Sequence, residues 1–174
     1  MIFRSLKEKA INKIIKKELG NAVVPGNTDK KGINTLAIII DYDKLSDFKP
    51  LMNLASALGV DNNSVYILGH VEKVYKNVNY LIPVFASSSV KSNGTVRTPE
   101  AKEFLTRDYD LLVNYYSGAE SVMHLVSVLT RASFKVGLGE ANSGINDLTL
   151  MVGENDLEGF QKELVKYLRI LNKL

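Results

Sequence analysis

The sequence contains no cysteine and no tryptophan, and only two of its 174 residues are histidines, His70 and His124. A chain without cysteine forms no disulfide, offers no thiol nucleophile and cannot ligate zinc or an iron–sulfur cluster through sulfur. Two histidines alone do not complete a typical catalytic zinc site. We therefore expect no metal and no other cofactor. The missing cysteines also fit a reducing, cytoplasmic location.

Long hydrophobic runs are missing as well. The longest strongly apolar run, LAIII (36–40), is far shorter than the roughly 20 residues that a membrane-spanning helix needs. The first twenty residues mix charged and apolar side chains without an uninterrupted apolar centre, so we see no secretory signal. Both observations favour the cytoplasm.

The short motifs of common α/β enzymes are also missing. The chain has no Gly-x-Ser-x-Gly element and no Gly-Lys-Ser/Thr ending of a Walker loop. The stretch KVGLGEANSGINDL (135–148) offers Gly137 and Gly139, as a phosphate-binding loop would. However, Asn142 holds the third glycine position, and turn-forming residues follow where a helix should begin. We expect the glycines to allow a close turn, and we keep a phosphate loop as the weaker alternative.

What remains is the composition of an ordinary globular protein, with 45% hydrophobic and 24% charged residues. Apolar β-branched runs alternate with segments of helical periodicity. The runs predict strands at 33–41, 64–70, 80–86, 109–116, 133–138 and 147–152. The periodic segments predict helices at 1–20, 45–59 with Ser46 as its cap, 98–107, 117–132 and 155–174.

Local signals refine some of these elements. Pro83 indicates that the third strand lies at a sheet edge. Ser117 and Glu120 have the spacing of a capping box, and so do Asn155 and Glu158. The apolar residues of the last helix that we expect to face inward are Leu157, Phe160, Leu164, Leu168 and Leu171.

Strands that alternate with helices predict a parallel sheet covered on both faces. We therefore expect an α/β, Rossmann-like fold, namely a three-layer α/β/α sandwich with a mainly parallel sheet of five or six strands. This sheet and its helices would form a single domain over residues 33–174. The basic helix of residues 1–20 would be either packed on that domain or appended to it.

The N-terminal helix holds most of the positive charge. Residues 1–20 carry six basic and two acidic side chains, so the rest of the chain has a net charge of −1 against +3 for the whole. The helix could bind a protein partner, an anionic membrane surface or nucleic-acid phosphates, or pack with its lysines in water. We favour packing because the polar face is short and lacks aromatic anchors. The near-neutral remainder, without a recognition motif, argues against nucleic acid.

Acidic residues end the first predicted strand, in DYD (41–43). Ligands of open parallel sheets gather at the carboxyl ends of the strands. Asp41 and Asp43 could there hold Mg²⁺ or act as acid and base. We favour solvated turn residues instead, because no third carboxylate has a spacing that supports a metal site.

The best candidate site is NYYSGAE (114–120), a junction of strand, loop and helix. Backbone N–H groups from Ser117 onward could bind an anion beside Asn114. Tyr115 or Tyr116 could stack on a ligand ring or donate a hydrogen bond. The alternative, which we favour, is that Ser117 and Glu120 cap the helix while the tyrosines pack at the sheet rim.

The two histidines give weaker signals. His70 follows the second predicted strand and could act as a general base. Without a placed nucleophile, we favour a loop role for it. His124 lies among apolar residues of a predicted helix, which indicates a core or subunit contact.

Four stretches, EFLTRDYDLLVNYYS, RASFKVGLGE, INDLTLMV and FQKELVKYLRILNKL, resemble a family of small bacterial α/β proteins of unknown function. In that family a basic first helix precedes a strand that ends in acidic residues, as IIIDYD does here. The resemblance covers most of the chain, implies a cytoplasmic protein and brings no catalytic residues. YDLLVNYY, a helix and ASFKVG are also similar to a unit of the N-terminal Rossmann-like domain of heptosyl-type glycosyltransferases, over about a third of the chain.

An intact α/β pattern without catalytic motifs predicts a non-catalytic cytoplasmic protein that binds or scaffolds a partner. The alternative is an enzyme or receptor for a small phosphorylated or sugar-like ligand. That ligand would lie at the carboxyl ends of the strands, near Asp41, Asp43, His70 and the segment 114–117. A third hypothesis is attachment to a membrane surface through residues 1–20.

Overall fold

The structure is a computed structural model that describes residues 2–21, 32–45, 47, 49–118, 120–139 and 144–174. Its centre is a six-stranded sheet in the order β3-β2-β1-β4-β5-β6, in which every neighbouring pair is parallel. The strands are β1 (Leu36–Asp41), β2 (Val65–His70), β3 (Val84–Phe85), β4 (Asp108–Tyr115), β5 (Arg131–Leu138) and β6 (Leu148–Leu150). The α-helices are α1 (Ile2–Asn21), α2 (Lys49–Leu58), α3 (Pro99–Thr106), α4 (Ser121–Leu129) and α5 (Leu157–Ile170). The expected α/β fold with a parallel sheet is confirmed.

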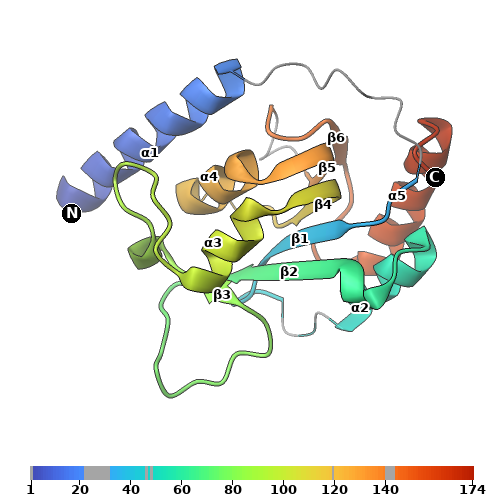
Figure 1. The fold of residues 1–174 in the computed structure, drawn as a ribbon, viewed down its shortest axis with the longest axis horizontal. Coiled ribbons are helices and arrows are strands. Elements are labelled where there is room, and N and C mark those ends of the chain that lie inside the picture. Colours follow the sequence, from blue (N-terminus) through green and yellow to red (C-terminus); the bar gives the residue numbers. More distant parts are fainter. Residues whose placement is uncertain (1, 22–31, 46, 48, 119, 140–143) are drawn as a thin grey trace.

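Helices cover both faces of the sheet and make three layers (Figure 1). One buried cluster joins Leu36, Ile38 and Ile40 of β1 to side chains of α2 and α5. A second cluster joins the intervening residues Ala37 and Ile39 to α1, α3 and α4. Because both faces of β1 are buried, its sequence is a continuous apolar run and not an alternating one.

The basic helix α1 packs against α4 and the sheet. Ile11 and Ile15 of α1 are buried in the second cluster, whereas Lys9, Lys13 and Lys16 are exposed. This arrangement keeps the charged groups in water while the apolar row is covered. Neither α1 nor any other described helix is long and apolar enough to cross a bilayer.

The third strand is shorter than the predicted range 80–86. Only Val84 and Phe85 pair with β2. The residues before Pro83 belong to a loop, within which the Tyr80 hydroxyl bonds to backbone groups of Lys73 and Tyr75. The edge position that Pro83 indicated is confirmed.

The predicted capping box of Asn155 and Glu158 is wrong. The N-cap of α5 is Asp156, whose carboxylate accepts the Gly159 N–H at 2.9 Å. Leu171 was expected to face inward but is exposed, because α5 ends one residue before it. The other expected inward residues of this helix pack on the core, namely Leu157, Phe160, Leu164 and Leu168.

Two further element ends differ from expectation. α2 begins at Lys49, and its predicted cap Ser46 lies outside the described residues. The helix expected to reach residue 132 ends at Leu129, since the chain from Arg131 onward pairs with β4. An ion pair of 2.8 Å between Arg131 and Asp108 marks the start of both strands.

Candidate functional site

The carboxyl ends of β1 and β4 lie side by side at the centre of the sheet, where the strand order reverses. Loops that leave such a switch point diverge, and the crevice between them is where open parallel sheets bind ligands. Asp41 ends β1 and Tyr115 ends β4. His70 ends β2 and is the register neighbour of Asp41. The strand-end residues singled out from the sequence therefore share one edge of the sheet.

The crevice itself is almost filled by the protein. Its free volume is about 30 Å³, and Asp41, Tyr115 and Glu154 are among its walls. Glu154, from the loop between β6 and α5, accepts the Ser117 backbone N–H at 2.9 Å and also the Ser117 hydroxyl. The Tyr115 hydroxyl donates to the Glu154 carbonyl at 2.7 Å. The N–H group that could have bound an anion is therefore already paired with a carboxylate.

The predicted capping box of Ser117 and Glu120 is wrong. α4 begins at Ser121 with Glu120 as its N-cap, so Ser117 lies in the preceding loop. The partner of Ser117 is instead Glu154, which is 37 residues away in the sequence. A local spacing cannot reveal a partner that only the tertiary fold brings near.

Asp41 and Asp43 have different partners. The Asp41 carboxylate lies 3.5 Å from the Lys44 ammonium group. The Asp43 carboxylate accepts the backbone N–H of Glu72 at 2.7 Å. The described residues contain no group of three or more His, Cys, Asp or Glu side chains that could hold a metal ion. Asp41 thus pairs within the turn after β1, whereas Asp43 links that turn to the loop after β2.

His70 is only 6% exposed, and its Nε2 atom has no hydrogen-bond partner among the described residues. The ring packs edge-on against Phe85, with 5.3 Å between the centroids. Burial lowers the pKa of His70, and the carboxylates of Asp41 and Glu120 oppose that shift. The imidazole is therefore neutral at pH 7. A buried nitrogen without a partner is uncommon, and here it marks unused hydrogen-bonding capacity at the carboxyl edge.

Asn114 and Tyr116 place their polar atoms in the core beneath α4. The Asn114 amide donates to the Asn146 side chain at 2.7 Å and accepts from the Ser127 hydroxyl at 2.8 Å. The Tyr116 hydroxyl bonds to the same Ser127 hydroxyl at 2.7 Å, and burial raises the pKa of Tyr116. On the opposite face, burial raises the pKa of Tyr115 to about 12. The side chains of Asn114, Tyr116, Ser127 and Asn146 thus form one hydrogen-bonded network beneath α4 and are not presented to a ligand.

Gly137 makes room for Asn146. A Cβ atom on Gly137 would lie 1.9 Å from the Asn146 amide nitrogen. Gly139 has a φ of +64°, a conformation that glycine adopts without strain. Asn142 lies outside the described residues. Packing thus explains the glycine at position 137, and backbone conformation explains the glycine at position 139, without a bound phosphate.

His124 lies in the first half of α4 and is half-buried. Its ring centroid is 5.9 Å from that of Tyr116, and the two ring planes are inclined by 32°. The expected contact of His124 with the core is therefore present.

Sequence reasoning missed a larger hollow beside the crevice, between the turn after β1 and the loop after β2. Its volume is about 880 Å³, and Tyr42, Tyr75 and Tyr80 are among its walls. The rings of Tyr42 and Tyr80 meet edge to face, with 5.7 Å between centroids and 72° between planes. We call it the tyrosine hollow. The available signal was the run VEKVYKNVNYL (71–81), in which apolar and tyrosine residues recur without helical or strand periodicity.

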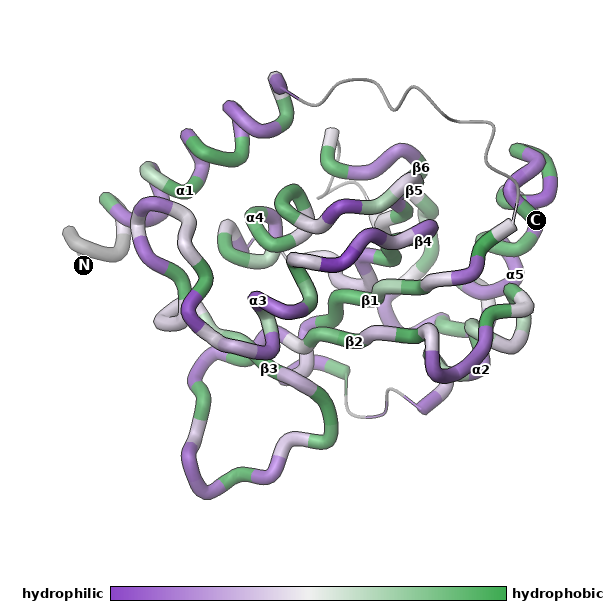
Figure 2. Tube along the Cα trace, viewed as in Figure 1, coloured by the Kyte–Doolittle hydropathy of each residue, from purple (hydrophilic) through white to green (hydrophobic). Residues whose placement is uncertain are grey.

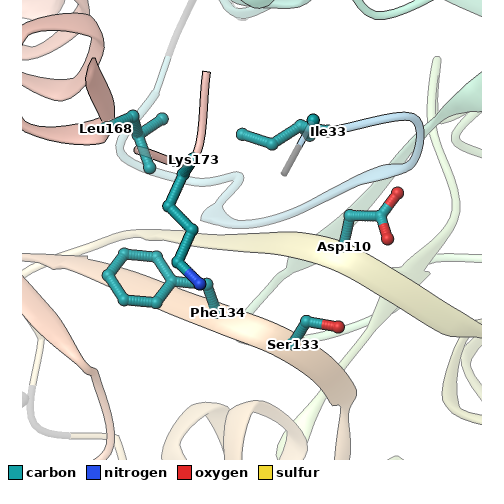
Figure 3. Close-up of a pocket in the computed structure, with 7 residues that line it drawn as sticks. Ile33, Asp110, Ser133, Phe134, Leu168 and Lys173 are labelled. Carbon is teal, nitrogen blue, oxygen red and sulfur yellow. The ribbon is translucent and has the colours of Figure 1, made fainter. Parts of the chain in front are cut away.

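At the opposite edge of the sheet, a small cavity lies between β4, β5 and the C-terminal end (Figure 3). Its volume is about 10 Å³, which is room for about one water molecule. The Lys173 ammonium group lies 5.4 Å from the centroid of the Phe134 ring. The Asp110 carboxylate accepts the backbone N–H groups of Asn34 at 2.8 Å and Thr35 at 3.1 Å. These groups fasten the segment before β1 to β4, and the cavity is too small for a ligand.

Fold and edge geometry define a Rossmann-like α/β protein whose switch-point crevice is closed by its own side chains. The chain belongs to a family of unknown function, DUF6913, whose sequence profile matches residues 7–171. The match reaches from α1 to α5 and includes every strand. No curated protein and no solved structure matches the chain significantly. The expected resemblance to a family of unknown function is confirmed.

Proposed function

We propose that the protein binds a partner protein through residues 71–83, the loop that joins β2 to β3, which we call the docking loop. One observation carries this proposal. Within eight residues of the loop, four large apolar side chains have between 42% and 74% of their surface exposed, namely Val74, Tyr75, Val78 and Leu81. Single exposed apolar residues are common, but a group of them indicates an interaction site. The loop projects from the body of the protein, and its hydrophobic and hydrophilic positions alternate (Figures 1 and 2).

The docking loop is held in shape by its own contacts. The N–H groups of Gly69 and Val71 each donate to carbonyls of the β3 segment at 2.9 Å, which fastens the two ends of the loop side by side. Within the loop, the Tyr80 hydroxyl accepts the Tyr75 N–H at 3.1 Å. Compact loops with closed ends frequently carry function. A preformed loop also loses less entropy when it binds.

The tyrosine hollow adjoins the docking loop and shares Tyr75, Val78 and Tyr80 with it. Tyrosine is common at the energetically dominant positions of interfaces, because it combines a large ring with a polar hydroxyl. A partner side chain could enter the hollow while the exposed apolar residues around it exclude water. The tyrosine hollow and the docking loop together thus form a recess surrounded by exposed apolar side chains, into which a partner side chain can fit.

The closed crevice favours this binding role over chemistry at the switch point. A free volume of about 30 Å³ leaves no room for a substrate. The Ser117 N–H and the Tyr115 hydroxyl are both engaged by Glu154. A substrate would have to displace these contacts before it could approach Asp41.

Site-specific photo-cross-linking tests the proposal. A photoreactive amino acid replaces Val78 in the docking loop or, as the matched control, exposed Lys162 on α5, which is remote from the loop. We expect a defined protein to be cross-linked from position 78 and not from position 162. That protein, once purified, should bind the full chain with a measurable dissociation constant.

A double variant of the docking loop tests the proposal through the affinity for the purified partner. Val78→Ser with Leu81→Ser should weaken binding of the purified partner by at least about tenfold, because both side chains would lie in the interface. Its melting temperature should stay unchanged, since both residues are exposed. Identical cross-linked products from positions 78 and 162, or full affinity in the double variant, would contradict the proposal. Binding of the loop to vesicles instead of a protein would also contradict it.

A small ligand at the carboxyl edge is a second candidate, favoured by the unused Nε2 atom of His70. Such a ligand would be phosphorylated or sugar-like and would lie near Asp41 and Asp43. A thermal-shift screen with nucleotides and sugar phosphates tests it. A ligand that raises the melting temperature of the protein but not of a His70→Leu variant would support this candidate, and the lack of any shift would remove it.

Four further expectations from the sequence stay predictions. They are the likeness to heptosyl-type glycosyltransferases, a bacterial origin, a cytoplasmic location and membrane attachment through residues 1–20. We also propose that the chain divides into a basic helix, residues 1–20, and a single α/β domain, residues 33–174.

A further inference from the structure

Another hollow, of about 480 Å³, lies between the start of α1 and the segment of residues 87–97. The polar residues of its walls are Lys7, Ser88, Lys91, Ser92, Asn93 and Arg97. Three of them are basic, and no acidic residue is among the described walls. We call it the basic hollow. It lies apart from the switch-point crevice and shares only Ser88 with the tyrosine hollow.

The fold brings the three basic side chains together from distant parts of the sequence. Residues 89–97 form a short antiparallel hairpin, across which the backbone N–H groups of Lys91 and Arg97 donate at 2.9 Å and 2.7 Å. Lys91 and Arg97 therefore come from its two opposite strands. Lys7 comes from α1, and its ammonium group donates to the Ser87 carbonyl just before the hairpin.

Apolar packing fixes α1 against this hairpin. Ile11, one helical turn after Lys7, shares a buried cluster with Val90. At the hairpin tip Gly94 has a φ of +81°, and a Cβ atom there would lie 3.1 Å from the side chain of Ile14. The tip thus approaches α1 closely. The place of Lys7 in the basic hollow is set by the core and not by a flexible arm.

The positive charge in the basic hollow has no counter-charge among the described walls. Neither Lys91 nor Arg97 has a side-chain hydrogen bond or an ion pair with the part of the chain that the structure describes. Burial and the nearby charge of Arg97 lower the pKa of Lys7. Holding like charges together without a counter-charge is unfavourable, and a bound anion would reverse that effect.

We propose that the basic hollow binds a phosphate group. The Arg97 guanidinium can donate two parallel hydrogen bonds to phosphate oxygens, and Lys7 and Lys91 add two further charges. The hydroxyl and amide groups in the walls supply neutral donors and acceptors. A volume of about 480 Å³ falls within the range of small-molecule sites. The site is independent of the docking loop and of the crevice.

Titration calorimetry of the full chain with pyrophosphate, at constant salt concentration, tests the proposal. Arg97→Gln and Lys91→Gln each remove one charge at an exposed position, so the melting temperature should not change. Each should weaken pyrophosphate binding by about tenfold or more, because each removes a charge-assisted hydrogen bond. Lys162→Gln removes the same charge from an exposed residue of α5 and should leave the affinity unchanged.

A second arm distinguishes a soluble phosphate from a lipid headgroup. It measures sedimentation with phosphatidylcholine vesicles that contain or lack a phosphatidylinositol phosphate. Pyrophosphate binding that depends on Arg97 assigns a soluble ligand, and vesicle binding with the same dependence, without pyrophosphate binding, assigns a headgroup. No binding in either arm, or equal binding by Arg97→Gln and Lys162→Gln, overturns the proposal. The docking-loop double variant should retain full pyrophosphate affinity, which separates this test from that of partner binding.

Discussion

The carboxylate of Glu154 accepts the backbone N–H of Ser117 at 2.9 Å, and this contact closes the crevice that the strand order opens. Glu154 comes from the loop after the edge strand β6, whereas Ser117 follows the central strand β4. An N–H group in such a loop is where an anionic ligand would bind in an open parallel sheet. Here the protein supplies the carboxylate itself, so the contact is part of the fold.

Removal of this carboxylate should therefore destabilise the protein. Glu154→Ala deprives both the N–H and the hydroxyl of Ser117 of a charged acceptor, and the free energy of unfolding should fall by about 1–2 kcal/mol. Urea denaturation measures the difference. Glu158→Ala, at an exposed position of α5, should change stability by no more than about 0.5 kcal/mol. Equal effects of the two substitutions would mean that the contact to Ser117 contributes no more than a surface charge.

Gly137→Ala should be more harmful than a change at an open glycine. The new methyl group would overlap the Asn146 amide, which lies 1.9 Å from the position of the added carbon. Asn146 also bonds to buried Asn114, so it cannot move away without losing that bond. We expect a loss of about 1–3 kcal/mol of unfolding free energy. Gly153→Ala, where no atom lies within 4 Å, is the control, and a similar loss there would refute the packing argument.

The sequence predicted those elements whose signal is local. The run LAIII predicted a buried strand because both faces of a central parallel strand are apolar. Asp41, His70 and Tyr115 were expected to share an edge, and they do, since parallel strands end on the same side. The closure of the crevice could not be predicted, because it depends on a residue 37 positions from Ser117.

The docking loop and the basic hollow escaped prediction for the same reason. The apolar run 80–86 predicted a strand that includes Tyr80, but the Tyr80 hydroxyl bonds to backbone groups of the docking loop. In the sequence, Lys7 contributes only to the net positive charge of residues 1–20. Its proximity to Lys91 and Arg97 arises from packing of α1 on a hairpin more than eighty residues away. Both sites depend on contacts between residues that are distant in the sequence, and such contacts produce no pattern within a short stretch of sequence.

Lys135 should make stability depend on pH. Burial lowers the pKa of Lys135 to about 8, although its ammonium group donates to the Ser127 carbonyl at 2.8 Å. An unperturbed lysine titrates near 10.5, so between these values the unfolded chain binds more protons than the native protein. The contribution of this site to stability therefore rises with pH across that window, and at neutral pH the buried charge is unfavourable.

Urea denaturation at several pH values between about 7.5 and 10 measures this effect. Lys135→Met keeps an apolar side chain of similar length and should remove most of the rise. Lys162→Met, at an exposed position of α5, should retain it. The same pH profile in both variants would show that Lys135 is not the group responsible.

Tyr80→Phe should loosen the docking loop without unfolding the protein. The substitution keeps the ring that meets Tyr42 and removes the hydroxyl that accepts the Tyr75 N–H. Amide hydrogen exchange at Tyr75 should accelerate by about fivefold, whereas global stability should fall by no more than about 1 kcal/mol. Tyr167→Phe is the control, because the Tyr167 hydroxyl makes no hydrogen bond with the described residues. Unchanged exchange at Tyr75 would mean that other contacts fix the loop. The fixed shape of the docking loop could then not be attributed to the Tyr80 hydroxyl.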